Sequence, residues 1–190
     1  QNFGDYVITP SRPGYRFAPP SVSSRMSGTR SFYFTASLLP PPGLIAFVSS
    51  RSGDDDIWVA DADGGDLRVL VQDTGSQRDP AWAPDGYRLA YASDEGSSGF
   101  ELWVLDLTDA LGPTRLGVFG REPAWSPDGS RIAFATGGGL RVLDLADSNV
   151  TPLTSDPSDA SPAWHPDGAS IVFERSALDG TSDLYEIGLA

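Results

Sequence analysis

The chain has 190 residues with 13 Lys or Arg and 26 Asp or Glu, so its formal net charge is −13. This length suits one domain with an appendage, and the acidic balance argues against nucleic acid and anionic membrane surfaces, since both require a basic face. Cysteine is absent, which excludes disulfides and thiolate metal sites, and 21 Gly with 16 Pro favour short strands and many turns.

The first 30 residues are rich in Pro, Ser and Gly and have no core pattern of their own. Two short stretches between prolines alternate in a way that fits extended segments laid along a surface. We therefore predict an extended N-terminal arm over residues 1–30. The residues expected to form its assembly strands are Tyr6, Val7, Ile8, Thr9, Tyr15 and Phe17.

The start of the chain and its most apolar stretch bear on localisation. Because the sequence begins with Gln1 rather than Met, we interpret it as a mature secreted protein after removal of a signal peptide, with an excised fragment as the alternative. The most apolar stretch, residues 38–48, is interrupted by three prolines, so no membrane span is expected.

An internal repeat dominates the rest of the chain. The motif Pro-Ala-Trp-x-Pro-Asp-Gly occurs three times, at Pro80–Gly86, Pro123–Gly129 and Pro162–Gly168. The tryptophans of these copies are 43 and 39 residues apart, and each copy precedes an apolar strand, an earlier copy of which is Ile45–Val48. A period of about 40–45 residues with several short strands is typical of propeller blades.

These segments resemble the TolB-type repeat, a branch of the WD-like β-propeller repeats, over roughly residues 44–190. The resemblance is specific for fold and says little about function, because such propellers serve many roles. We predict an all-β protein in which residues 31–190 form a small β-propeller, with four blades of four antiparallel strands.

The four predicted blades are not equally complete. The second and third each contain sequence for four strands, whereas the innermost strand of the first blade has to come from the degenerate segment Phe32–Leu38. The fourth blade has no sequence for an outer strand before Ala190. We predict that residues 5–9 of the arm pair with this open edge, either closing their own ring or adding to a second copy.

Two groups of aspartates are candidate sites. Asp85, Asp128 and Asp167 recur in the Pro-Asp-Gly turns, where an Asp side chain can bond the backbone two residues on, so we interpret them as turn-capping groups. Asp61, Asp63 and Asp66 have the alternate spacing of calcium loops, but the full twelve-residue pattern with its terminal Glu is missing. We predict no metal and no cofactor, with calcium at these three residues as the alternative.

No pattern of a catalytic centre is recognisable. The single histidine, His165, stands where Ala83 and Ser126 stand in the other repeats, and no Gly-x-Ser-x-Gly elbow is present. We predict a protein that is not an enzyme.

Our first hypothesis is a secreted propeller, extracellular or at the cell surface, that binds copies of itself through its arm as a subunit of a filament or lattice. Two alternatives stay open. One is a TolB-like periplasmic adaptor that docks another envelope protein, and the other is a regulatory propeller fragment of a larger peptidase.

Overall fold

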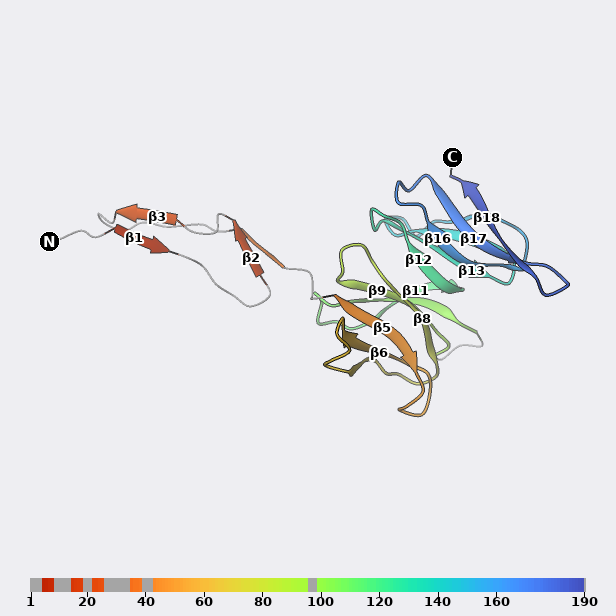
Figure 1. Ribbon diagram of the computed structural model, residues 1–190, viewed down its shortest axis with the longest axis horizontal. Helices are drawn as coiled ribbons and strands as arrows, with labels where there is room; N and C mark the ends of the chain where they lie inside the picture. The colour runs from red at the N-terminus through yellow and green to blue at the C-terminus, as the bar shows by residue number, and fades with distance from the viewer. Residues whose placement is uncertain are drawn as a thin grey trace. The chain divides into compact units, whose positions relative to one another are not determined.

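The computed structural model describes residues 43–95 and 99–189 in full, and the backbone of four strands before them (Figure 1). The early strands are β1 (Asp5–Ile8), β2 (Tyr15–Ala18), β3 (Val22–Arg25) and β4 (Thr35–Leu38). The chain divides into two compact units, Gln1–Pro41 and Pro42–Ala190. In the first unit, β1 pairs with β3 and β2 pairs with β4, both in antiparallel register.

The second unit consists of four antiparallel sheets in chain order. The first sheet contains β5 (Leu44–Ser49), β6 (Asp56–Asp61) and β7 (Arg68–Val71). The second contains β8 (Gln77–Trp82), β9 (Arg88–Ser93), β10 (Glu101–Asp106) and β11 (Thr114–Phe119). The third contains β12 (Arg121–Trp125), β13 (Arg131–Thr136), β14 (Gly139–Asp144) and β15 (Val150–Pro152). The fourth contains β16 (Asp159–Trp164), β17 (Ser170–Ser176) and β18 (Ser182–Gly188). Four packed antiparallel sheets confirm the predicted all-β propeller class.

Each pair of neighbouring sheets encloses an apolar core of its own. Successive residues of a strand point to opposite faces, so one strand contributes to two cores. Leu89 of β9 packs toward the first sheet against Ile57, whereas Ala90 packs toward the third sheet against Ile132. These residues are fully buried. The β-branched and aromatic character of these strands therefore serves burial on both faces.

The sheets form an open series. The first strands of the second, third and fourth sheets, β8, β12 and β16, are called leading strands here. Strand β12 contacts both β8 and β16, and extensive strand contacts connect each sheet to the next. Within residues 43–95 and 99–189, no extensive contact connects the first sheet with the fourth. In Figure 1, β5 and β6 lie at one end of the series, and β17 and β18 lie at the other.

Two expected strand pairings are not made within the described chain. Phe32–Leu38 were expected to provide the innermost strand of the first blade, but β4 pairs with β2, and β5 is an edge strand of a three-stranded sheet. The arm was expected to border the fourth blade of its own ring or of a second copy. Within this chain β1 pairs with β3, and β18 is an edge strand, so the pairing with a second copy stays a prediction. Of the predicted assembly residues, Thr9 lies outside the described residues.

The turn sequence before β5 gives a physical reason for the first difference. The turns that precede β9, β13 and β17 each contain an Asp in Pro-Asp-Gly, whereas the corresponding segment before β5 is Pro-Pro-Pro-Gly. Proline has no N–H to donate, and the segment has no carboxylate to close a tight reversal. The local signal that joins two strands is therefore missing at this one place.

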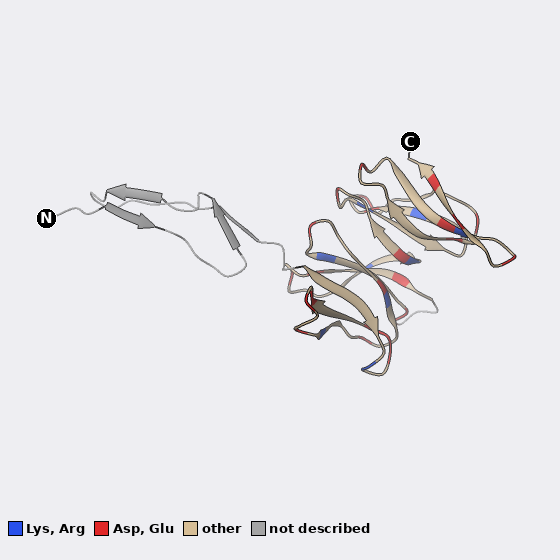
Figure 2. Cartoon of the chain, viewed as in Figure 1, with Lys and Arg blue, Asp and Glu red and all other residues tan. Residues whose placement is uncertain are grey.

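Acidic residues gather in the turns between strands, as Figure 2 shows for residues 43–95 and 99–189. In the same part of the chain, no helix has the length and apolar character needed to cross a membrane.

Candidate functional site

A repeated tryptophan builds the junction between neighbouring sheets. Nε1 of Trp125 donates a hydrogen bond of 3.0 Å to the carbonyl oxygen of Ala81 in the preceding leading strand. The guanidinium carbon of Arg88 lies 4.6 Å from the centre of the Trp125 ring, within range of a cation–π interaction. The same contact recurs one repeat later with Trp164, the carbonyl of Ala124 and Arg131. The second sheet is thus fixed to the third, and the third to the fourth, by the same three groups.

A second repeated contact uses the residue before the motif proline. Asp79, Glu122 and Ser161 occupy this position with φ values of 54°, 54° and 52°, in the left-handed region that is costly for residues other than glycine. Asp79 Oδ2 accepts a hydrogen bond from the backbone N–H of Glu122 at 3.2 Å. Glu122 Oε2 in turn accepts one from the N–H of Ser161 at 2.6 Å. The register of the leading strand is irregular at this position, and the left-handed residue directs the Asp79 and Glu122 carboxylates to the next sheet.

These junction contacts stop at both ends of the series. Nε1 of Trp82 is buried and has no hydrogen-bond partner among the described residues, because the first sheet lacks the leading strand whose carbonyl would accept it. At the other end, Ser170 stands where Arg88 and Arg131 stand in the earlier repeats. The outer surfaces of the first and fourth sheets are therefore the two open ends of the described propeller.

Two apolar side chains mark these open ends. Ile45 on β5 is 51% exposed, and Leu184 on β18 is 78% exposed. The residues at the position of Ile45 in the other repeats are 0% exposed; they are Leu89, Ile132 and Ile171. The residues at the position of Leu184 are also 0% exposed; they are Ile57, Leu102 and Leu140. Each exposed side chain therefore points to the place that a further sheet would occupy.

The two open ends carry opposite charges beside their apolar residues. The guanidinium carbon of Arg51 lies 4.6 Å from the centre of the Trp58 ring on the side of the first sheet that bears Ile45. On the fourth sheet, Glu174 is the cross-strand partner of Leu184, and Glu186 follows Leu184 by two positions, so it lies on the same face. A cation thus borders one end, and two carboxylates border the other.

The three predicted turn aspartates each accept a hydrogen bond from the N–H two residues on. These bonds run to Asp85 from Tyr87 at 2.8 Å, to Asp128 from Ser130 at 3.0 Å, and to Asp167 from Ala169 at 2.8 Å. The hydroxyl of Ser126 and the N–H and hydroxyl of Ser130 lower the pKa of Asp128 to about 2. The structure therefore uses these carboxylates inside the turns.

His165 has a role in its own turn. Its Nδ1 lies 2.8 Å from Oδ1 of Asp167, at the position where the hydroxyl of Ser126 bonds Asp128. The N–H of Ala169, followed by His165, holds the pKa of Asp167 below its usual value. The imidazole thus takes the place of a hydroxyl in a turn geometry that recurs in the three repeats.

The acidic turn after β6 is held by contacts within itself. Asp63 Oδ1 accepts a hydrogen bond of 2.9 Å from the N–H of Gly65, and Asp66 Oδ2 lies 2.6 Å from Nη1 of Arg68. Asp61 is the last residue of β6. Among the residues that the structure describes, no three His, Cys, Asp or Glu side chains form a group that could hold a metal ion.

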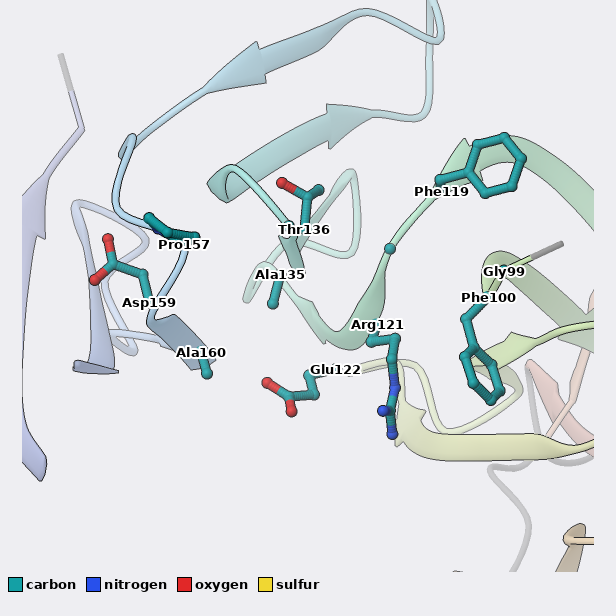
Figure 3. Close-up of a pocket in the computed structure, with 12 residues that line it drawn as sticks. Gly99, Phe100, Phe119, Arg121, Glu122, Ala135, Thr136, Pro157, Asp159 and Ala160 are labelled. Atoms are coloured by element: carbon teal, nitrogen blue, oxygen red, sulfur yellow. The ribbon is translucent and has the colours of Figure 1, made fainter. Parts of the chain in front are cut away.

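A hollow of about 390 Å³ lies between the ends of the second, third and fourth sheets (Figure 3). Phe100 and Phe119 line one side of it, and Asp159 lies on the opposite side. Two of its charged groups form ion pairs, Arg121 with Asp79 at 3.1 Å and Asp159 with Arg175, and a third, Glu122, accepts a hydrogen bond from the N–H of Ser161. The Arg175 guanidinium holds the pKa of Asp159 below its usual value. The rest of the lining is mainly apolar, and Phe100 and Phe119 are its aromatic residues.

Sequence reasoning missed the residues of the junctions and open ends. A signal for them existed, because aligning the repeats places Ile45 with three core residues and Leu184 with three others. The arginines that stack on the tryptophans likewise follow the motif tryptophan of their own repeat by six positions, at Arg88 and Arg131.

Comparison with curated proteins finds partial matches, while no known family profile matches the chain. The Tol-Pal system protein TolB of Bordetella pertussis is 34% identical over 74 residues, which is 39% of this chain and 15% of that protein. The Tol-Pal system protein TolB of Methylobacillus flagellatus is 31% identical over 94 residues, 48% of this chain and 20% of that one. The matches therefore span only 15–20% of the length of these relatives.

Solved structures show the same likeness in the fold. The putative TolB of Agrobacterium tumefaciens superposes with a TM-score of 0.66 at 21% identity, covering 77% of this chain and 57% of that chain. TolB of Acinetobacter baumannii superposes with a TM-score of 0.65 at 23% identity, covering 80% and 40%. The predicted resemblance is confirmed: the chain contains a TolB-like propeller repeat region.

Proposed function

From a TolB-like propeller repeat region with two open ends, we propose that the protein is a non-catalytic propeller that self-associates as a subunit of an extracellular filament or lattice. The observation that carries this proposal is the edge of the fourth sheet. Among the described residues, β18 pairs with β17 on one side and with no strand on the other. An edge of this kind presents backbone N–H and C=O groups that an added strand satisfies.

The N-terminal unit offers donor strands for this edge. β1 and β2 each belong to a two-stranded sheet, and an isolated pair of strands is only marginally stable in water. If β1 left β3 and paired with β18 of a second copy, the fourth sheet of that copy would have four strands. Donor and acceptor lie in different parts of the chain, so the contact is head-to-tail, and head-to-tail contacts that do not close produce filaments.

The contacts of the ionisable groups support a binding role over a chemical one. His165 contacts the carboxylate of Asp167, and Asp159 at the hollow of Figure 3 forms an ion pair with Arg175. The aspartates of the repeat turns accept backbone hydrogen bonds. These groups hold turns and sheets together, and such contacts compete with any role as acid, base or nucleophile.

Self-association is tested by sedimentation velocity over a wide range of protein concentration, with negative-stain microscopy of the most concentrated sample. We expect species that grow with concentration and appear as filaments or lattices. Deletion of residues 1–30 is expected to leave monomers whose far-ultraviolet circular dichroism retains the strand signal. Monomers of the full chain at every concentration would contradict the proposal.

A periplasmic protein-docking role is the second candidate, and the partial identity to Tol-Pal system TolB proteins favours it. In this case a propeller face would bind another envelope protein. Affinity capture from an envelope extract is expected to recover a Pal protein. Failure of purified Pal to bind the purified chain would remove this candidate.

A further inference from the structure

We infer that the open faces of the first and fourth sheets form a contact between copies, with the first-sheet face of one copy packed on the fourth-sheet face of the next. The inference rests on the proposed self-association and adds a side-chain surface to it. The first-sheet face is defined by Ile45, Phe47, Arg51, Trp58 and Val69. The fourth-sheet face is defined by Val172, Glu174, Leu184 and Glu186.

The interior junctions show how two such faces fit. At each junction, the leucine or isoleucine at the second position of β9, β13 or β17 packs on the preceding sheet. Leu89 does so against Ile57, and Ile132 does so against Leu102. Ile45 occupies the position of Leu89 and Ile132, and Leu184 occupies that of Ile57 and Leu102. The two open faces are therefore the two halves of a junction that the chain already makes three times.

Exposure distinguishes these two faces from the equivalent faces inside the series. Ile45 and Leu184 are 51% and 78% exposed at positions where the interior repeats show 0%. Val69, the cross-strand partner of Trp58, is another exposed apolar residue on the first-sheet face, with 38% of its surface exposed. In repeat architectures each unit contacts its neighbours through the same pair of surfaces, and a unit without a neighbour leaves one surface uncovered. A second copy of this chain supplies the missing neighbour at both ends.

The charges beside the two open faces favour a second copy of this chain as the binding partner. With a formal net charge of −13, two copies repel one another at a distance, so a stable contact requires local attraction. Arg51 projects from the first-sheet face, where it stacks on Trp58, and Glu174 and Glu186 flank Leu184 on the fourth-sheet face. A head-to-tail arrangement brings the cation of one copy to the carboxylates of the next, whereas matching two identical faces would pair like charges.

The decisive experiment uses two full-length variants, Leu184→Glu and Ile45→Glu, each of which blocks one face and leaves the other intact. Sedimentation velocity is expected to show an apparent dissociation constant at least about tenfold weaker for each variant alone, because a charge replaces a buried anchor. An equimolar mixture is expected to form 1:1 dimers, since the intact first-sheet face of one variant meets the intact fourth-sheet face of the other. Leu111→Glu, at a loop residue that is 89% exposed, is the matched control and is expected to associate like the wild type.

The outcomes separate this contact from the arm-strand route. If both face variants associate like the wild type while deletion of residues 1–30 abolishes assembly, the face contact is overturned and the proposed function stands. If the face variants lose assembly and the deletion retains it, the arm route fails and the face contact stands. A mixture of the two face variants that forms no dimer would also overturn the inference.

A charge exchange gives an independent readout. Arg51→Glu is expected to weaken association, and mixing it with the double variant Glu174→Arg, Glu186→Arg is expected to restore it, because opposite charges then face each other in one orientation. Absence of restoration, with circular dichroism showing both variants folded, would contradict the assigned pairing of faces.

Discussion

At the residue scale, the turn at Asp128 shows how a carboxylate stabilises the strand reversal. The hydroxyls of Ser126 and Ser130 donate to Asp128 Oδ1 at 2.6 and 2.8 Å, and the N–H of Ser130 donates at 3.0 Å. All three donors favour the ionised carboxylate, and they lower its pKa to about 2. The folded protein therefore binds this proton more weakly than the unfolded chain does.

We expect Asp128→Asn to lower the free energy of unfolding at pH 7, because the amide oxygen is a weaker acceptor than the carboxylate. The contribution of a carboxylate with a lowered folded-state pKa is present above its unfolded pKa of about 4 and is lost as the pH falls through about 2. The difference between variant and wild type should therefore shrink across this range. Urea denaturation between pH 7 and pH 2 measures it.

The control for this prediction is Asp54→Asn, at an exposed aspartate in the loop before β6. It is expected to leave the free energy of unfolding at pH 7 close to that of the wild type. An Asp128→Asn deficit of the same size at pH 7 and pH 2 would contradict the assigned cause.

At the element scale, each leading strand holds the next sheet through a tryptophan. Trp125 donates to the Ala81 carbonyl and stacks with Arg88, whereas the N–H of Trp82 is buried without a partner among the described residues. The two side chains occupy the same position in consecutive repeats, so the same substitution removes different interactions at each. Comparing the stability lost at Trp125 with that lost at Trp82 therefore measures how much the junction contact contributes.

We expect Trp125→Phe to destabilise the protein by about 1–2 kcal/mol more than Trp82→Phe does. The first substitution leaves the Ala81 carbonyl without its donor and weakens a cation–π contact, while the second removes a donor that had no acceptor. Urea denaturation of both variants gives the difference. Equal losses of stability would show that the hydrogen bond to Ala81 contributes little to the junction.

The local elements were largely predictable from the sequence, and one was not. Each of the three Pro-Asp-Gly turns is followed by the predicted apolar strand, β9, β13 or β17, because turn and strand signals there are close in sequence. The segment at β4 carries no such turn before β5, and it pairs with β2. The choice between two partners for one short strand depends on long-range packing that local patterns do not encode.

At the scale of the whole molecule, the interior sheets are covered on both faces and the end sheets on one. Ile132, Ala133 and Phe134 of β13 are all 0% exposed, whereas Ile45 of β5 and Leu184 of β18 are exposed. Local opening costs less where fewer apolar contacts are broken. The stability of the series should therefore fall from its middle toward its two ends.

Amide hydrogen exchange, measured at low protein concentration, is expected to be slowest in β9 and β13 and fastest in β5 and β18. Raising the concentration until copies associate is expected to slow exchange in β18, where backbone groups gain partners. Uniform exchange rates across the four sheets would contradict this gradient.

The candidate site was only partly accessible from the sequence. The turn aspartates Asp85, Asp128 and Asp167 were found because their role depends on residues two positions away. The junction between Trp125 and Ala81 joins residues from different repeats, and its recognition required the packing of one sheet on another. The three strands of the fourth sheet within this sequence were predicted from the repeat. Repeat alignment also places Leu184 with core residues, whereas its exposure required the structure.

By itself, the sequence determined the repeat, the all-β class, the strand positions and the turn chemistry, since these follow from patterns within a single repeat. Only the tertiary structure decided that β4 pairs with β2, that Trp82 lacks an acceptor, and that Ile45 and Leu184 are exposed. The physical reason is that burial belongs to a pair of sheets and not to a strand. Residues of the same type at the same repeat position are covered or uncovered according to whether a neighbouring sheet lies against them.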